Sequence, residues 1–158
     1  MLAIENLINK VLKGEAQKNA LDLIAHIRAN EDVFTIPMCE DNAENIWNGC
    51  DVSNLGYIVI NGSDDFPGPW TIWFGANNFG EYSKAPVDER IKEFAWKHVS
   101  PCGNCGKNCT TATNTKVFGK VFENTCMSNL LFVNPNAEAV ECMKKLIDIK
   151  KNDIISGK

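Results

Sequence analysis

The central part of the chain carries four cysteines at a spacing that suits a metal ion. Cys102, Cys105 and Cys109 follow one another in a C-x2-C-x3-C pattern, and Cys126 comes after sixteen intervening residues. Zinc takes four ligands at the corners of a tetrahedron and favours cysteine thiolates. A C-x2-C pair lets two thiolates from one turn reach the same ion. The pattern therefore predicts a structural zinc site formed by these four cysteines.

Other kinds of site use the same cysteines. A bacterial iron–sulfur run reads C-x2-C-x2-C-x3-C-P, so this chain lacks one cysteine and the proline, and an iron–sulfur cluster would need a non-standard ligand set. Cys102 and Cys105 also form a C-x-x-C pair of the thiol-redox kind. A predicted helix ends just before them, and its C-terminal dipole disfavours a thiolate. His98 is an alternative metal ligand in an H-x3-C-x2-C arrangement.

The other three cysteines are dispersed along the chain. Cys39, Cys50 and Cys142 have no partner motif around them, so each is predicted to be a small buried side chain. The first residues lack the basic region and apolar block of a signal peptide, which predicts a cytoplasmic location. Thiols stay reduced there, so the seven cysteines are not expected to form a disulfide framework.

Length and charge narrow the classes of partner. The 158 residues predict a single domain over 1–158 with a core of its own. The net charge of -4 and the pI of about 5.2 predict no nucleic-acid partner, because nucleic-acid binders present a basic face. No apolar run approaches the roughly 20 residues of a bilayer span, which predicts no membrane partner. A small molecule or a protein partner remains.

Aromatic residues crowd the middle of the chain and mark a second candidate site. Trp47, Tyr57, Trp70 and Trp73 are candidates for a ligand pocket, since pockets are rich in aromatic side chains. On a strand, Trp70 and Trp73 point to opposite faces, so one of them faces the core. The alternative is that helices and loops cover both faces and all four side chains pack in the core.

No sequence motif in the chain identifies a catalysed reaction. A nucleophile elbow, a phosphate loop, a dinucleotide fingerprint and an H-E-x-x-H pair are all missing, and two histidines offer little general-base capacity. Catalytic residues are therefore unknown. The sequence favours a binding protein with a structural zinc site, and the alternative is a thiol-redox or metal-dependent (iron–sulfur) enzyme that uses the same cysteines.

Periodicity and turn residues predict an α+β protein. Its sheet is expected to be mostly antiparallel, to be covered on one face by helices, and to carry a cysteine-rich metal-binding loop. Four helices follow from apolar spacing of 3.6 residues and from Pro or Asn at their starts. We predict helices over 2–12 and 15–29, from Pro86, and from Asn134, and strands over 33–36, 55–60, 70–75, 116–122 and 128–133.

One part of this order resembles a known type of protein. The apolar run 130–133, followed by Asn134-Pro135 and the helical pattern 141–147, is similar to the strand-to-helix ending of small bacterial YdhG-like (frataxin-like) α+β proteins. The resemblance implies N-terminal helices paired with an antiparallel sheet. The cysteine cluster departs from that family, and no acidic ridge lies on the first helix, so the resemblance implies no functional residues.

Overall fold

A computed structural model describes residues 1–41, 48–61, 68–75, 87–102 and 112–157 of the chain. It divides into two compact units. Unit 1 comprises Met1–Trp73 and Phe132–Lys158, and unit 2 comprises Phe74–Leu131. The elements in chain order are α1 (Ile4–Val11), α2 (Gly14–Arg28), β1 (Gly49–Val52), β2 (Gly56–Ile60), β3 (Trp70–Gly75), α3 (Glu89–Lys97), β4 (Val99–Pro101), β5 (Ala112–Val117), β6 (Lys120–Val133) and α4 (Ala137–Ser156).

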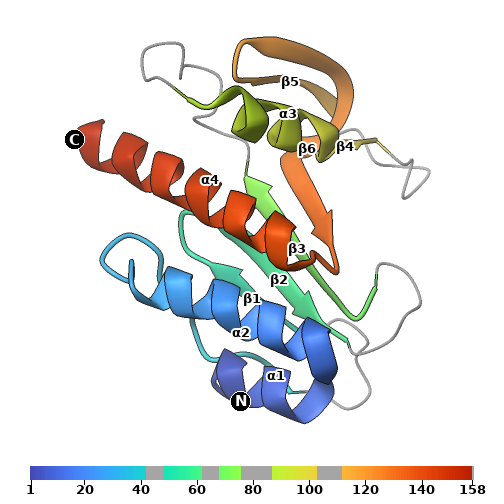
Figure 1. Cartoon of the computed structure of the whole chain (residues 1–158), viewed down its shortest axis with the longest axis vertical. Helices are drawn as coiled ribbons and strands as arrows, with labels where there is room; N and C mark the ends of the chain where they lie inside the picture. The colour runs from blue at the N-terminus through green and yellow to red at the C-terminus, as the bar shows by residue number, and fades with distance from the viewer. Residues whose placement is uncertain (42–47, 62–67, 76–86, 103–111, 158) are drawn as a thin grey trace. The chain divides into compact units, whose positions relative to one another are not determined.

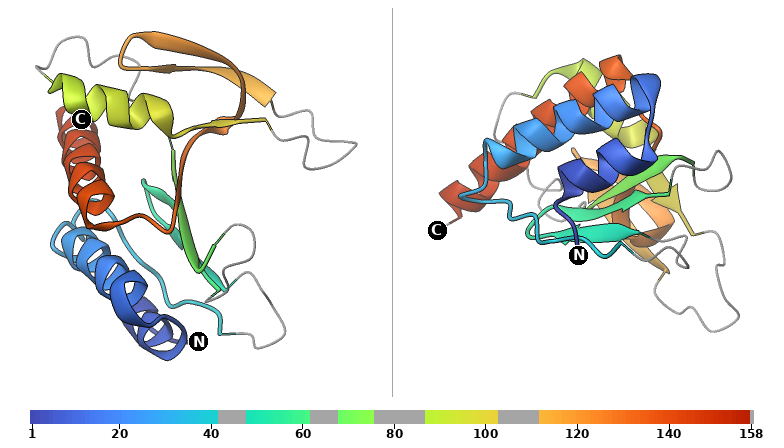
Figure 2. Two further views of the ribbon diagram at one scale, coloured as in Figure 1. Left: turned by 45° about the vertical axis from the view of Figure 1, so that its right-hand side comes forward. Right: turned by 90° about the horizontal axis from the view of Figure 1, so that it is seen from below.

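Unit 1 has the α+β layers that the sequence predicts. Its strands follow the order β1-β2-β3, with the end of β6 beside β3, and β1 pairs antiparallel with β2. Helices α1, α2 and α4 all lie on the same side of these strands (Figures 1 and 2). The prediction of an antiparallel sheet covered on one face by helices is therefore confirmed for this unit.

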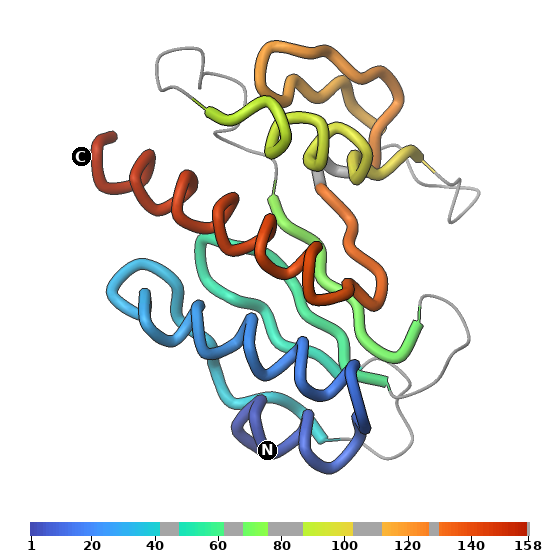
Figure 3. Tube along the Cα trace, viewed as in Figure 1, coloured from blue at the N-terminus to red at the C-terminus, as the bar shows by residue number. Residues whose placement is uncertain are grey.

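The helices of unit 1 are held to the sheet by apolar stripes and to one another by charged pairs. Leu7 of α1, Leu23 of α2 and Leu146 of α4 are fully buried. Helices α2 and α4 run side by side (Figure 3), and His26 contacts Asp148 across them at 2.8 Å. Such exposed pairs contribute little, so burial of the stripes, at about 2 kcal/mol for each large side chain, supplies most of the stabilisation.

Glu5 and Lys150 are among the groups of unit 1 whose pKa departs from its ordinary value. Glu5 accepts hydrogen bonds from two nitrogens of the Arg28 guanidinium, at 2.8 and 3.2 Å, and this contact lowers the pKa of the Glu5 carboxyl. Lys150 of α4 is only 5% exposed, and its removal from water lowers its pKa to about 8. The buried ammonium is therefore a cost to folding at neutral pH.

Unit 2 is built from α3 and from strands that pair with β6. Strand β4 pairs with β6 through Val99 and Leu130, and β5 pairs with β6 from Ala112 to Val117. Helix α3 begins at the cap Asp88, whose carboxylate accepts from Arg90 N at 2.8 Å. It packs on β5, and Trp96 Nε1 donates to Val117 O at 2.7 Å.

A tight turn joins β5 to β6, and the sequence did not predict it. Residues 116–122 were expected to form one continuous strand. Instead Phe118 and Gly119 have φ of 46° and 81°, and Val117 pairs with Lys120 around them. Two left-handed residues match the right-handed twist of the flanking strands, so this is the two-residue hairpin turn.

Three further expectations about local structure are wrong. Residues 33–36 form no strand, and Cys39 instead makes a single bridge to Leu2. Helix α3 starts at Glu89 rather than at Pro86, and α4 is capped by Asn136, whose side chain accepts from Ala139 N, rather than by Asn134. At both helix starts the side-chain cap, rather than the proline, sets where the helix begins.

The expectation that all cysteines are reduced is also wrong. Cys39 and Cys50 form a disulfide, and both are buried, at 1% and 3% exposure. The prediction of burial holds for them, and for Cys142 at 6%, but the bond was missed. Disulfides persist in oxidising compartments, so this bond weighs against the cytoplasmic location. None of the helices in the described part of the chain combines the length and the apolarity of a membrane span.

Candidate functional site

Two of the four predicted zinc ligands lie on neighbouring segments of unit 2. Cys102 follows β4, and its backbone N–H donates to Asn124 O of β6 at 2.8 Å. Cys126 lies two residues further along β6 and pairs with Ala112 of β5. Both cysteines are half-buried. Cys102 and Ala112, the described residues on either side of 103–111, therefore both contact the short stretch of β6 from Asn124 to Cys126.

The other two predicted ligands, Cys105 and Cys109, lie outside the described residues. Within the described residues, no three side chains of the metal-binding types gather around a common point. Of the four predicted zinc ligands, only Cys102 and Cys126 are among these described residues. Because Zn–S bonds measure about 2.3 Å, the sulfurs of one site lie within about 4.6 Å of one another. Cys126 is offset by two residues along β6 from Asn124, the residue to which Cys102 is hydrogen-bonded.

His98 does not fit the same ion as Cys102. The three residues of β4 separate them, and four residues of extended chain span about 13 Å. The two side chains are too short to close that distance onto one zinc. His98 Nδ1 instead contacts Phe94 O at 2.7 Å, and its ring stacks on the Phe94 ring with centroids 4.5 Å apart. The structure therefore favours the cysteine set over the histidine alternative.

The aromatic residues proposed for a pocket separate onto two faces of the unit 1 sheet. Trp70 is fully buried on the side of Ile72 and Phe74, which is core. Trp73 points to the other face, where its ring lies 6.5 Å from that of Tyr57 at an angle of 47°. Trp47 lies outside the described residues. The structure thus brings Tyr57 and Trp73 together and places Trp70 apart from them.

A glycine makes room for Tyr57 on this face. A Cβ on Gly49 would lie 2.7 Å from the Tyr57 ring and 2.6 Å from Ile58 O. We expect Gly49→Ala to lower the free energy of unfolding by about 2 kcal/mol, because both the ring and the β1–β2 backbone must shift. Urea unfolding measures the loss of stability, and near-UV circular dichroism shows whether the packing of the Tyr57 ring has changed. The exposed turn substitution Ser53→Ala is the control, and equal stability of the two variants would contradict the expected clash.

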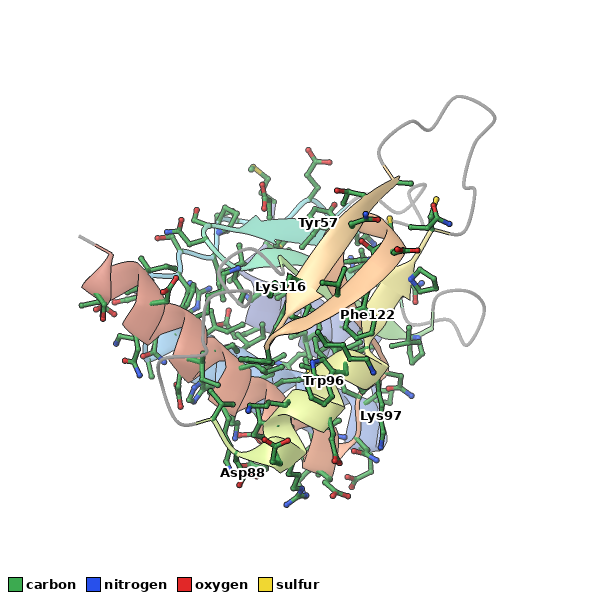
Figure 4. The ribbon with its side chains drawn as sticks, turned by 90° about the horizontal axis from the view of Figure 1, so that it is seen from above. Tyr57, Asp88, Trp96, Lys97, Lys116 and Phe122 are labelled. Carbon is green, nitrogen blue, oxygen red and sulfur yellow. A yellow bond between two sulfur atoms is a disulfide. The ribbon has the colours of Figure 1, made fainter. Side chains whose placement is uncertain are left out.

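A hollow in unit 2 was not found from the sequence. It measures about 240 Å³ and is lined by Glu93, Trp96 and Lys97 of α3 and by Lys120 of β6. The Lys120 ammonium lies 5.3 Å from the ring centroids of both Trp96 and Phe122. Figure 4 shows Trp96 and Lys97 on α3 and Phe122 on the neighbouring strand. The sequence signal for this hollow was the presence of Lys120 and Phe122 at alternate positions of a predicted strand. That signal became interpretable only when the structure showed β6 paired with β5 and α3 packed on β5.

The fold and these sites define an α+β protein of two units, with a cysteine-bearing strand pair and a lysine–aromatic hollow in the second unit. Comparison with protein-family models, with curated proteins and with solved structures found no match to this chain. The resemblance to YdhG-like (frataxin-like) proteins therefore stays a prediction from element order.

Proposed function

We propose that the chain is a binding protein whose unit 2 is held together by a structural zinc ion on Cys102, Cys105, Cys109 and Cys126. One observation carries the proposal. Cys102, the residue after β4, donates its backbone N–H to Asn124 O of β6, two residues before Cys126. Two of the predicted ligands, 24 positions apart in sequence, are thus neighbours in the fold. The ion would tie the segment 103–111 to β6.

Binding is the activity that the side chains of the described residues support best. The rings of Tyr57 and Trp73 form a pair on the face of unit 1 opposite its helices, and Tyr57 is 38% exposed. Tyrosine and tryptophan at such positions offer broad apolar contact together with polar edges. A small molecule or a protein partner would use this pair.

The test is elemental analysis of protein purified without an affinity tag. We expect about one zinc per chain, and loss of zinc with a lowered melting temperature in Cys102→Ser and in Cys126→Ser. Cys142→Ala is the matched control, because Cys142 is a buried cysteine of α4 outside the proposed ligand set, and this variant should keep its zinc. Metal-free protein in which the four thiols react rapidly would refute the zinc site. Iron with sulfide would instead favour the iron–sulfur alternative.

A thiol-redox enzyme is the second candidate, and the Cys39–Cys50 disulfide is the observation that favours it. The bond indicates that thiols of this protein are oxidised. Under this candidate, Cys102 and Cys105 would cycle between thiol and disulfide. Mass spectrometry of alkylated protein at controlled redox potentials separates the two proposals, because zinc-bound thiolates resist both alkylation and oxidation until the metal is removed.

A further inference from the structure

The hollow of unit 2 combines positive charge with an aromatic wall. Lys97 comes from α3 and Lys120 from the paired strand β6, so the two ammonium groups approach from different elements. The position of Lys120 is defined by its contacts with the rings of Trp96 and Phe122. A cation that is held between two rings is ordered before any ligand arrives, which lowers the entropic cost of binding an anion.

Among the described residues, Lys97 and Lys120 share the lining of the hollow with one carboxylate, that of Glu93. Other lysines of the described residues are paired, such as Lys92 with Glu89 on the same helix. Among the residues described, no carboxylate lies within 4.0 Å of the ammonium of Lys97 or Lys120. Unit 2 also differs in charge from the whole chain. Its sequence, 74–131, holds seven Lys or Arg and five Asp or Glu, whereas the chain has 16 and 20. Unit 2 therefore has an excess of basic residues, although the whole chain has a net charge of -4.

The size and chemistry of the hollow select one kind of ligand. At about 240 Å³ it is smaller than the roughly 300–1,000 Å³ of pockets that enclose a whole small molecule. It suits one unit of a longer chain. That unit would supply an anion for Lys97 and Lys120, a planar group for Trp96 and a hydrogen-bond donor for Glu93. A nucleotide supplies all three within one unit, whereas an acidic peptide supplies its carboxylates and its aromatic rings from different side chains.

We propose that this hollow binds single-stranded nucleic acid, with a base against Trp96 and the neighbouring phosphate between Lys97 and Lys120. Binding of this kind rests on stacking and backbone charge and needs no base-edge readout. A duplex hides the faces of its bases, so a base that stacks on Trp96 requires a single strand. None of the residues that line the hollow is a proposed zinc ligand.

The test is fluorescence anisotropy with a labelled oligothymidylate strand and purified full-length protein. Two lysine contacts predict a slope of about -1.4 for the logarithm of the binding constant against the logarithm of salt concentration. An abasic strand of the same length and charge should bind about tenfold more weakly, because it cannot stack on Trp96. Lys97→Gln and Lys120→Gln should each weaken binding at least fivefold. Lys92→Gln is the matched control on α3 and should bind as the wild type does.

Several results would overturn the proposal. Absence of binding at low salt is one, and equal affinity for the abasic strand or for heparin is another, since either would reduce the contact to general charge attraction. Unchanged binding by both lysine variants would place any affinity elsewhere on the chain. Free thymidine monophosphate that competes as well as the strand would overturn the strand as ligand. Melting curves show whether the variants are folded. Zinc analysis of the same samples shows whether a loss of binding accompanies a loss of metal, so that a failure of this proposal is distinguished from a failure of the proposed zinc site.

Discussion

Replacement of both Cys39 and Cys50 by alanine is expected to lower the free energy of unfolding by about 3 kcal/mol. The disulfide closes a loop of 11 residues in the unfolded chain, and the lost loop-closure entropy corresponds to about that amount. Both cysteines of the disulfide are also held by backbone interactions in the native structure. Cys39 exchanges two backbone hydrogen bonds with Leu2, at 2.7 and 2.9 Å, and Cys50 pairs with Ile58 in the sheet.

Urea unfolding of the wild type and of the double variant measures this loss. Addition of a reductant to the wild type should lower its stability by a similar amount and should leave the double variant unchanged. Cys142→Ala, which removes a buried thiol that is outside the disulfide, is the control for lost side-chain volume. If reductant destabilised both proteins equally, or neither, the bond between Cys39 and Cys50 would not be the source of the stability.

Substitution of Lys150 by methionine is expected to stabilise the protein by about 2 kcal/mol at pH 7. Lys150 is 5% exposed on α4, and burial lowers the pKa of its ammonium to about 8, with partial compensation from Asp153. The shift measures the cost of keeping the charge away from water. Methionine has a similar length and carries no charge, so it removes the cost and keeps most of the packing.

The pH dependence follows from the sign of the shift. Below pH 8, Lys150 is charged in both the folded and the unfolded chain, so the full cost is present. Between pH 8 and the unfolded value of 10.5, the folded protein releases its proton first, and the stability of the wild type rises with pH. The difference between the wild type and Lys150→Met should therefore shrink as pH rises from 8 to 10.5.

Chemical denaturation at pH 7, 9 and 10.5 measures both effects. The matched control is Lys145→Met, because Lys145 is exposed on the same helix, and its substitution should change stability little at any pH. A Lys150→Met variant that is less stable than the wild type at pH 7 would show that the ammonium contributes more through its contacts than it costs through burial.

Short-range pattern was enough to predict most of the elements. The spacing of Leu7 and Ile8, or of Leu23 and Ile27, predicts α1 and α2 because a helical stripe is a property of neighbouring residues. The run Trp70–Gly75 predicts β3 for the same reason. The hairpin at Phe118-Gly119 was missed because phenylalanine rarely takes a left-handed conformation, and only pairing of β5 with β6 holds it there.

The sites depended on contacts that no local pattern contains. The sequence predicted that Cys102 and Cys126 belong together, because a zinc ion requires four ligands. In the fold, Cys102 is hydrogen-bonded to Asn124 of β6, two residues before Cys126. The sequence did not predict the Cys39–Cys50 bond, since that pair meets only where the bridge to Leu2 holds Cys39 near β1. The hollow at Trp96 and Lys120 has the same origin. Residue types and spacing determined which chemistry this chain can carry, and strand pairing decided which side chains meet to perform it.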